Sequence, residues 1–304
     1  MTSYVLTLIG NGGPASLEPV HIERVWQSLA PAGKTGETGR VDWLAEREAC
    51  DLFIESPISA AAIAEQARGA LSGTAVDAVC TSTEGRRKRL LVSDMDSTVI
   101  NQECIDELGD AIGLGPRIRE ITAAVVRGDI SFSDALRQRL ALMKGMERSL
   151  LMSVYEERIS LKPGARTLVQ TMRRHGAFCI LVSGGFSFFT RRVAESIGFH
   201  DHQGNELAFE DGKLTGEVGE PILGRSAKLN TLTRLCDEKG LEPSDVLAVG
   251  DGANDIKMIE AAGLGVAFHA SPSLIKQANA RIDHGDLTAL LYIQGFRKSE
   301  FVHS

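Results

Sequence analysis

The sequence predicts an α/β fold, a doubly wound (Rossmann-like) parallel sheet with a small helical-bundle cap, preceded by an N-terminal α+β domain. Three observations lead to it. Short apolar runs alternate with helical patterns after residue 90, the interval 103–159 carries helical spacing only, and a smaller set of strand-like and helix-like segments fills residues 1–80. With 304 residues, two domains are expected. We place them at 1–80 and 81–304, with the cap at about 103–160.

The N-terminal domain is predicted from mixed strand and helix patterns. Strand-like runs cover 4–9, 74–80 and one or two segments within 41–56. Helical patterns cover 21–29 and 58–71, and PAGKTGETG at 31–39 is a glycine-rich loop. The polar and basic stretch at 81–89 is interpreted as a solvated linker into the second domain.

The second domain is predicted to hold a parallel sheet covered on both faces. Its apolar strands are expected at 90–94, 177–182, 245–249 and 264–268. Helices are expected at 164–175, 186–197 and 226–239, and a hairpin turns at Asp211-Gly212 within 206–218. In such a sheet, ligands bind at the carboxyl ends of the strands.

The interval 103–159 does not follow this alternation. Its apolar residues recur at spacings of three and four, and breaks at 113–116 (GLGP) and 128–132 (GDISF) divide it into short helices. Because it directly follows the first strand of the domain, we expect it to stand as a lid over the strand ends.

Polar residues follow three of the predicted strands. They are Asp94 and Asp96 after the first, Ser183 and Gly184 after the second, and Asp251, Asn254 and Asp255 after the third. Since the carboxyl ends of these strands meet in one crevice, up to four carboxylates should gather there. Burying them without a cation would be costly, which indicates a metal ion as their partner.

Magnesium is the cation that suits this site, because it prefers oxygen ligands and binds with one or two carboxylates plus a substrate phosphate. Asp94 and Asp251 are the expected ligands, with Asp255 nearby. An aspartate can attack phosphorus and form an aspartyl-phosphate. We therefore expect Asp94 to be the nucleophile, and Asp96 to protonate the leaving oxygen and then activate water.

Further groups are expected to hold the phosphate. Ser183 and the amide of Gly184 precede a predicted helix, whose N-terminus favours an anion. Lys228, at the start of another helix, is the best candidate for a cation facing the transferred group. Thr98 is expected to orient Asp94 and Asp96 by hydrogen bonding.

Four stretches together resemble a known family. DMDST, SGG, the lysine of SAK and GDGANDIKM are similar to the successive motifs of the haloacid dehalogenase superfamily, and most closely to its phosphoserine phosphatases, over roughly residues 90–290. The resemblance implies Mg²⁺-dependent hydrolysis of O-phospho-L-serine, the last step of serine biosynthesis. It also implies metal ligation by Asp94, Asp251 and the main-chain oxygen of Asp96, and phosphate contacts from Ser183, Gly184, Asn254 and Lys228.

The same resemblance assigns Glu103 and Arg139 to the substrate. Phosphoserine carries an ammonium group that Glu103 could pair with, and a carboxylate onto which the Arg139 guanidinium could fork. Met95 stands where many relatives have another apolar residue, and we expect it to point away from the crevice. Some bacterial relatives carry an N-terminal domain of the amino-acid-sensing ACT type or a degenerate version of it. The resemblance therefore implies an ACT-like N-terminal domain here, in which we see no ligand signature.

Composition limits the other functions. A net charge of −7 argues against general nucleic-acid binding, and no stretch is apolar and long enough to span a membrane. The five cysteines are widely spaced, as expected in a reducing compartment, and we expect a cytoplasmic protein, with a possible homodimer through the N-terminal domain.

Three alternatives stay open. A signalling receiver would also carry a phosphorylated aspartate, but Asp96 and the lid favour turnover. A phosphatase or phosphotransferase of the same fold could act on another small phosphate ester, or pass the phosphoryl group to an alcohol such as homoserine. An inactive binding module is the least favoured, because all four motifs are intact.

Overall fold

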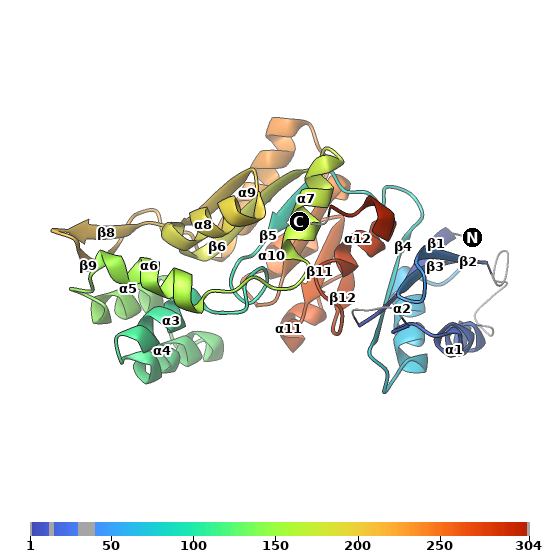
Figure 1. Ribbon diagram of the computed structural model, residues 1–304, viewed down its shortest axis with the longest axis horizontal. Helices are drawn as coiled ribbons and strands as arrows, with labels where there is room; N and C mark the ends of the chain where they lie inside the picture. Colours follow the sequence, from blue (N-terminus) through green and yellow to red (C-terminus); the bar gives the residue numbers. More distant parts are fainter. Residues whose placement is uncertain (1, 12–14, 30–39, 303–304) are drawn as a thin grey trace.

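The computed structural model describes residues 2–11, 15–29 and 40–302, so the glycine-rich loop predicted at 31–39 lies outside the described residues. Figure 1 shows an N-terminal sheet at one end of the long axis, a larger sheet in the middle, and a cap of helices with a hairpin at the other end. In the described part of the chain, no helix is both long and apolar enough to cross a membrane.

The N-terminal unit has the order β-α-β-β-α-β. Its elements are β1 (Thr2–Gly10), α1 (Pro19–Leu29), β2 (Val41–Ala45), β3 (Ala49–Ser56), α2 (Ala60–Ala70) and β4 (Val76–Ser82). The strands form one antiparallel sheet in the order β2-β3-β1-β4, which is the ferredoxin-like arrangement. The predicted α+β class is confirmed, whereas the boundary at residue 80 stays a prediction.

One face of this sheet is covered by its own two helices. Leu6 and Leu8 of β1 pack in a cluster with Val25 of α1 and Ile63 of α2. Helix α2 begins at a Ser59 cap, whose hydroxyl accepts a hydrogen bond from the Ala62 amide at 3.3 Å. On its other side the sheet meets the second domain, where β4 contacts β12 and β1 contacts α12.

The central sheet is parallel and has the strand order β12-β11-β10-β5-β6-β7. In chain order the strands are β5 (Leu90–Ser93), β6 (Phe178–Phe186), β7 (Asp201–Asn205), β10 (Val246–Gly250), β11 (Leu264–Phe268) and β12 (Ala280–Ile282). The predicted fold class is confirmed. Strands β7 and β12 were not predicted, because DHQGN is polar and ARI is only three residues long.

Helices cover both faces of the central sheet. They are α7 (Ala165–Arg174), α8 (Ser187–Ile197), α9 (Arg225–Lys239), α10 (Ile256–Ala261), α11 (Pro272–Ile275) and α12 (Ala289–Ile293), with short 3₁₀ turns at Pro243–Asp245 and Lys298–Glu300. Successive residues of β5 face opposite sides. Leu91 packs with Leu168 of α7, whereas Leu90 and Val92 pack with Leu232 of α9. Both faces are therefore buried, as the continuous apolar runs predicted.

The cap consists of four helices and a hairpin. The helices are α3 (Cys104–Ala111), α4 (Gly115–Arg127), α5 (Phe132–Leu142) and α6 (Arg148–Arg158), and the hairpin is β8 (Leu207–Glu210) with β9 (Lys213–Val218). Both predicted breaks are confirmed. Gly128 ends α4 with a φ of 83°, and Ser131 caps α5 by accepting from the Asp134 amide at 3.1 Å.

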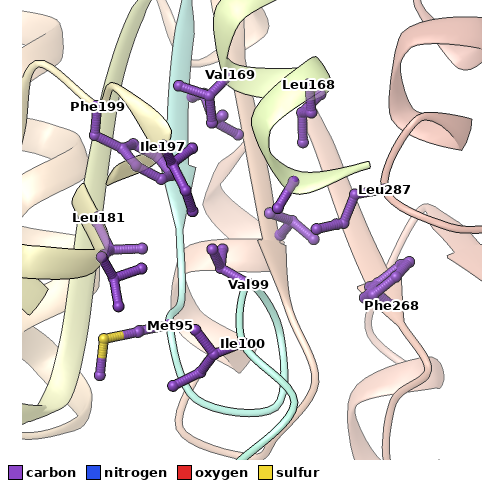
Figure 2. Packing of buried hydrophobic residues seen from close by; sticks show 14 of the residues in the cluster. Met95, Val99, Ile100, Leu168, Val169, Leu181, Ile197, Phe199, Phe268 and Leu287 are labelled. Carbon is purple, nitrogen blue, oxygen red and sulfur yellow. The ribbon is translucent and has the colours of Figure 1, made fainter. Parts of the chain in front are cut away.

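Met95 anchors the loop after β5 in the core. Its side chain is fully buried, and Figure 2 shows it close to Ile100 and Leu181. It belongs to the cluster on the α7 side of the sheet and does not line the cavity described below, as predicted. Because successive residues of this loop point to opposite sides, the side chains of Asp94 and Asp96 point away from that core cluster and line the cavity.

Candidate active site

The carboxyl ends of three neighbouring strands, β10, β5 and β6, open onto one cavity of about 130 Å³. Cap residues from α3 and α5 close its other side. The predicted site residues that line it are Asp94, Asp96, Glu103, Arg139, Ser183, Gly184, Asp251 and Asn254. The fold therefore brings together groups that are up to 160 positions apart in the sequence.

Asp94 is a buried carboxylate with one fixed oxygen. Its Oδ1 accepts a hydrogen bond from the Met95 amide at 2.7 Å and lies 2.8 Å from Nζ of Lys228. Its Oδ2 has no hydrogen-bond partner among the described residues, and the side chain lines the cavity. The carboxylate is thus held in orientation while one oxygen remains available to a ligand or an electrophile.

Lys228, on α9, lies between two carboxylates. Its ammonium is 3% exposed and also donates to Oδ1 of Asp255, which is fully buried. Burial by itself would lower the pKa of Lys228, but Asp255 and Asp94 outweigh it and raise that pKa above its usual value. The lysine does not line the cavity, so the predicted contact with phosphate would have to reach past Asp94.

Asp255 is tied down on both oxygens. Oδ1 is taken by Lys228, and Oδ2 accepts from the Gly252 amide at 3.1 Å. Burial, followed by the negative charge of Asp94, raises its pKa to about 7, against the opposing attraction of Lys228. Its oxygens are already engaged within the chain, so its contribution to the site is to hold Lys228 in place.

Asp96 connects the sheet to the cap. Its Oδ1 accepts from the amide of Cys104, the first residue of α3, at 2.9 Å, and its Oδ2 accepts from the Ser183 hydroxyl at 2.9 Å. Burial, and then the charge of Asp94, raises the pKa of Asp96. A raised pKa favours the protonated form that a general acid needs.

The turn after Ser183 leaves no space for side chains. Gly185 donates its amide to the Ser183 hydroxyl at 2.8 Å. A Cβ on Gly185 would come within 2.9 Å of Oδ2 of Asp96, and one on Gly184 would come within 3.0 Å of the Phe132 ring of the cap. The two glycines therefore allow this turn to approach Asp96 and the Phe132 ring of the cap closely.

Asp251, directly after β10, is oriented by Thr98. The Thr98 hydroxyl donates to Oδ1 of Asp251 at 3.1 Å. The prediction that Thr98 would orient Asp94 and Asp96 is therefore wrong, because the loop turns its side chain toward the neighbouring strand end. Burial, then the charge of Asp94, raises the pKa of Asp251 to about 6.

The carboxylates form a group that fits a divalent cation. One oxygen from each of Asp94, Asp251 and Asp255 lies within 4.8 Å of the others. Because both oxygens of Asp255 are engaged, the available ligands are Oδ2 of Asp94 and the carboxylate of Asp251. An all-oxygen set with two carboxylates is the kind of site that Mg²⁺ prefers.

Glu103 and Arg139 lie on the cap side of the cavity. Glu103 precedes α3, and its Oε1 accepts from the Ser97 hydroxyl at 2.7 Å. Desolvation and the charge on Asp96 raise the pKa of Glu103, and because the residue is exposed, we expect water to limit that rise. Arg139, on α5, is only 6% exposed, and burial lowers its pKa. The cap side of the cavity therefore carries one carboxyl group and one guanidinium besides the carboxylates at the strand ends.

The apolar lining was not among the predicted site residues. Ile105, Phe132 and Leu136 of the cap help close the cavity. Their helical spacing marked them as residues that face an apolar surface, but the pattern does not distinguish a core from a cavity wall. Only the position of the cap over the strand ends makes that distinction.

Comparison with known proteins agrees with this geometry. The model of the haloacid dehalogenase-like hydrolases matches residues 91–260. A phosphoserine phosphatase of Archaeoglobus fulgidus is 43% identical over 209 residues, which is 69% of this chain and 60% of that protein. The chain thus spans less than two thirds of that relative's length.

Two solved structures are also similar. The first is a phospho-aspartyl intermediate analogue of phosphoserine phosphatase, with 34% identity, a TM-score of 0.64, and coverage of 68% of this chain and 98% of that one. The second is a probable phosphoserine phosphatase from Vibrio cholerae, with 27% identity, a TM-score of 0.77, and coverage of 98% and 88%. The motifs, the fold and these similarities together show that the chain belongs to the haloacid dehalogenase-like hydrolase family, among its phosphoserine phosphatases.

Proposed function

We propose that this protein hydrolyses O-phospho-L-serine to L-serine and phosphate through an aspartyl-phosphate formed on Asp94, with Mg²⁺ as cofactor. The observation that carries the proposal is the state of Asp94. One of its oxygens is fixed by Lys228 and the Met95 amide, and the other has no hydrogen-bond partner within the described chain, at a cavity that Asp96 also lines. The names of the similar phosphoserine phosphatases support the substrate.

The first step forms the covalent intermediate. Oδ2 of Asp94 attacks phosphorus, and the bond between phosphorus and the serine oxygen breaks. Asp96, whose raised pKa favours its protonated form, gives its proton to the departing serine oxygen. Serine leaves as a neutral alcohol, and Asp96 becomes a carboxylate.

The second step regenerates the enzyme. Asp96 accepts a proton from a water molecule as the water oxygen attacks phosphorus, and the bond between phosphorus and Oδ2 of Asp94 breaks. Phosphate leaves, Asp94 is again a carboxylate, and Asp96 is again protonated. Acid–base help of this kind typically contributes roughly 10²–10⁴-fold to the rate.

Several groups are proposed to hold the phosphate during both steps. Ser183, Gly184 and Asn254 line the cavity, and their hydroxyl, main-chain amide and side-chain amide would donate hydrogen bonds to the phosphate. Lys228 stabilises the attacking carboxylate and supplies positive charge from behind it. The single hydrogen of the Ser183 hydroxyl is donated to Oδ2 of Asp96, so Ser183 would donate to the phosphate only when a protonated Asp96 no longer accepts that hydrogen.

Mg²⁺ would be held by the carboxylates of Asp94 and Asp251 and by the main-chain oxygen of Asp96. When bound, the ion offsets the repulsion between the attacking carboxylate and the phosphate. Thr98 keeps the Asp251 carboxylate oriented for this, and Lys228 does the same for Asp94.

Glu103 and Arg139 are proposed to select the amino-acid part of the substrate. The carboxylate of Glu103 would pair with the ammonium group, and the guanidinium of Arg139 would bind the carboxylate. Both line the cavity from the cap, opposite the strand ends that hold the phosphate. The substrate would therefore bridge the cap and the sheet.

The five cysteines are free and buried, which supports a reducing compartment and hence a cytoplasmic location. A homodimer through the N-terminal domain stays a prediction. Gel filtration with light scattering at several protein concentrations would test it, because a monomeric mass at all of them contradicts the dimer.

A screen of phosphate release over phosphorylated metabolites, with and without Mg²⁺, tests the proposed function. We expect O-phospho-L-serine among the best substrates and a loss of turnover on chelation. The Arg139→Ala variant should lose phosphoserine hydrolysis and keep hydrolysis of a simple aryl phosphate, which has no carboxylate to bind. Unchanged phosphoserine kinetics in this variant, or a preference for unrelated esters, would contradict the proposal. Added homoserine should not yield a phosphate ester.

A further inference from the structure

Arg139 is held by a second cap helix as well as by its own. Its Nε donates to the main-chain oxygen of Ala135 on α5 at 3.3 Å, so the side chain folds back along its helix. Its Nη1 donates to the Thr122 hydroxyl on α4, also at 3.3 Å. A guanidinium fixed at two nitrogens has its plane set in advance, which lowers the entropy lost when it binds a carboxylate.

The direction of the Thr122 hydrogen bonds is also set. The Thr122 hydroxyl donates its own hydrogen to the main-chain oxygen of Ile118, one turn back on α4, at 3.2 Å. Its lone pairs are therefore left to accept from Arg139. Because a hydroxyl has a single hydrogen, this arrangement presents an acceptor to the guanidinium and not a competing donor.

The helix that carries Thr122 is itself firmly seated. Ile118 is fully buried, and a Cβ on Gly109 of α3 would come within 2.8 Å of its Cγ1. The packing of α3 against α4 therefore fixes the position of the helical turn that carries Thr122 relative to the cavity. A binding group supported on packed helices in this way is placed more accurately than one on a loop.

Arg139 keeps donors for a ligand. Nη2 has no hydrogen-bond partner among the described residues. It is not among the buried unpaired atoms of those residues, so it is accessible, and Arg139 lines the cavity. Asp106 of α3 has a buried Oδ1 without a hydrogen-bond partner within the described residues, and it offers Arg139 a counter-charge. The guanidinium is thus supported from the cap and open toward the cavity.

We propose that Thr122 is a positioning residue that orients the Arg139 guanidinium toward the carboxylate of the substrate, an inference that rests on the proposed hydrolysis of phosphoserine. Thr122 does not line the cavity and touches no substrate atom in this scheme. Loss of the Thr122 hydroxyl should weaken the binding of substrates that carry a carboxylate and spare others, because only a carboxylate binds the Arg139 guanidinium.

The test compares two substrates in holoenzyme with Mg²⁺. O-phospho-L-serine carries the carboxylate, and O-phosphoethanolamine has the ammonium and phosphate but lacks it. Thr122→Val keeps the shape of the side chain and removes the acceptor. We expect it to lower kcat/KM for phosphoserine by about tenfold, mainly through KM, and to change that for phosphoethanolamine by less than about twofold.

Three further variants make the result specific. Thr122→Ser restores the hydroxyl and should recover kcat/KM for phosphoserine. Ser153→Ala removes a cap hydroxyl whose partner is Glu157, and should change neither substrate. In an Arg139→Ala background, Thr122→Val should cause no additional loss, because the group that it positions is gone.

Each result is decisive. An equal loss on both substrates, or no recovery in Thr122→Ser, would mean that Thr122 only stabilises the cap and would overturn the inference. If the ratio of kcat/KM between the two substrates is unchanged in Thr122→Val but changed in Arg139→Ala, the inference about Thr122 is overturned and the proposed function stands. If the ratio of kcat/KM is unchanged in Arg139→Ala as well, both the inference and the proposed function are overturned, because Arg139 then does not bind the substrate carboxylate.

Discussion

Two groups of buried carboxylates differ in how their charges are matched. Where the N-terminal sheet meets the second domain, Asp51 receives Nη1 and Nη2 of Arg86 at 2.7 and 3.0 Å and the Thr7 hydroxyl at 2.7 Å. Nearby, Asp77 accepts the amides of residues 283–285 at distances from 2.7 to 3.3 Å. Each of these two carboxylates has donors from the chain on both of its oxygens.

The carboxylates at the strand ends are matched in this way only in part. Four carboxylates gather there, those of Asp94, Asp96, Asp251 and Asp255. Asp96 and Asp255 have donors on both oxygens, and Lys228 forms ion pairs with Asp94 and Asp255, but Oδ2 of Asp94 has no hydrogen-bond partner in the described chain. Burying unmatched negative charge is costly, and three of these groups have raised pKa values. The difference supports the proposal that a cation and a phosphate complete the site at the strand ends, whereas the carboxylates at the domain interface need no ligand.

The largest effect should come from Asp94→Asn. The amide keeps the size of the carboxylate but is not a nucleophile toward phosphorus, so we expect phosphate release to fall by at least about 10⁴-fold. Because the substitution removes one of several like charges, the thermal unfolding midpoint without metal should stay the same or rise. Turnover close to that of the unchanged protein would contradict the role of Asp94.

Metal binding should distinguish the two groups of carboxylates. Mg²⁺ at about 100 times its dissociation constant should stabilise the protein by about 2.7 kcal/mol, seen as a higher unfolding midpoint, and EDTA should reverse the shift and abolish turnover. Asp251→Asn should lose most of this stabilisation. Asp77→Asn, in the interface group, should keep it, and an equal loss in both variants would show that the cation does not bind at the strand ends.

Breaking the matched pair should affect stability and not chemistry. Arg86→Met leaves Asp51, which is 1% exposed, without its counter-charge, and we expect a loss of roughly 3 kcal/mol in the free energy of unfolding. Turnover per folded molecule should change little. Denaturant unfolding measures the loss, and the double variant Arg86→Met with Asp51→Leu should recover part of it. A large fall in kcat with unchanged stability would instead couple this interface to the active site.

The smallest effect is expected at Met95. It lies between Asp94 and Asp96 in the sequence, but its side chain packs in the core (Figure 2). Met95→Leu conserves volume, so the loss of stability should stay below about 1.5 kcal/mol, with kcat nearly unchanged. Thermal unfolding and steady-state kinetics check this, and a strong fall in kcat would show that the side chain controls the loop geometry.

The strand ends could be predicted from the sequence because they follow from local patterns. Short apolar runs marked the parallel strands, and Asp94, Ser183 and Asp251 each come after one of them. Their convergence follows from the topology of a parallel sheet. The cap helices were likewise visible from their spacing and from the breaks at Gly128 and Ser131.

Contacts between distant elements could not be read in the same way. Thr98 bonds to Asp251, 153 positions away, and Lys228 is buried between two aspartates although helix-start lysines are usually solvated. The basic stretch 81–89 was interpreted as solvated, and this is wrong for Arg86, whose side chain is only 13% exposed and pairs with Asp51. In each case the deciding partner comes from another element, which a local charge pattern does not contain.

Trapping the phosphorylated enzyme tests the role of Asp94 most directly. Protein mixed with Mg²⁺ and O-phospho-L-serine is quenched during turnover and treated with borohydride, which reduces an acyl phosphate to an alcohol. Mass spectrometry of the peptide that contains residues 90–100 should then show Asp94 converted to homoserine, only when substrate is present and never in Asp94→Asn. An unmodified Asp94 during active turnover would contradict the proposed mechanism. Conversion of Asp96, or of Asp251 in its own peptide, to homoserine in place of Asp94 would contradict it as well.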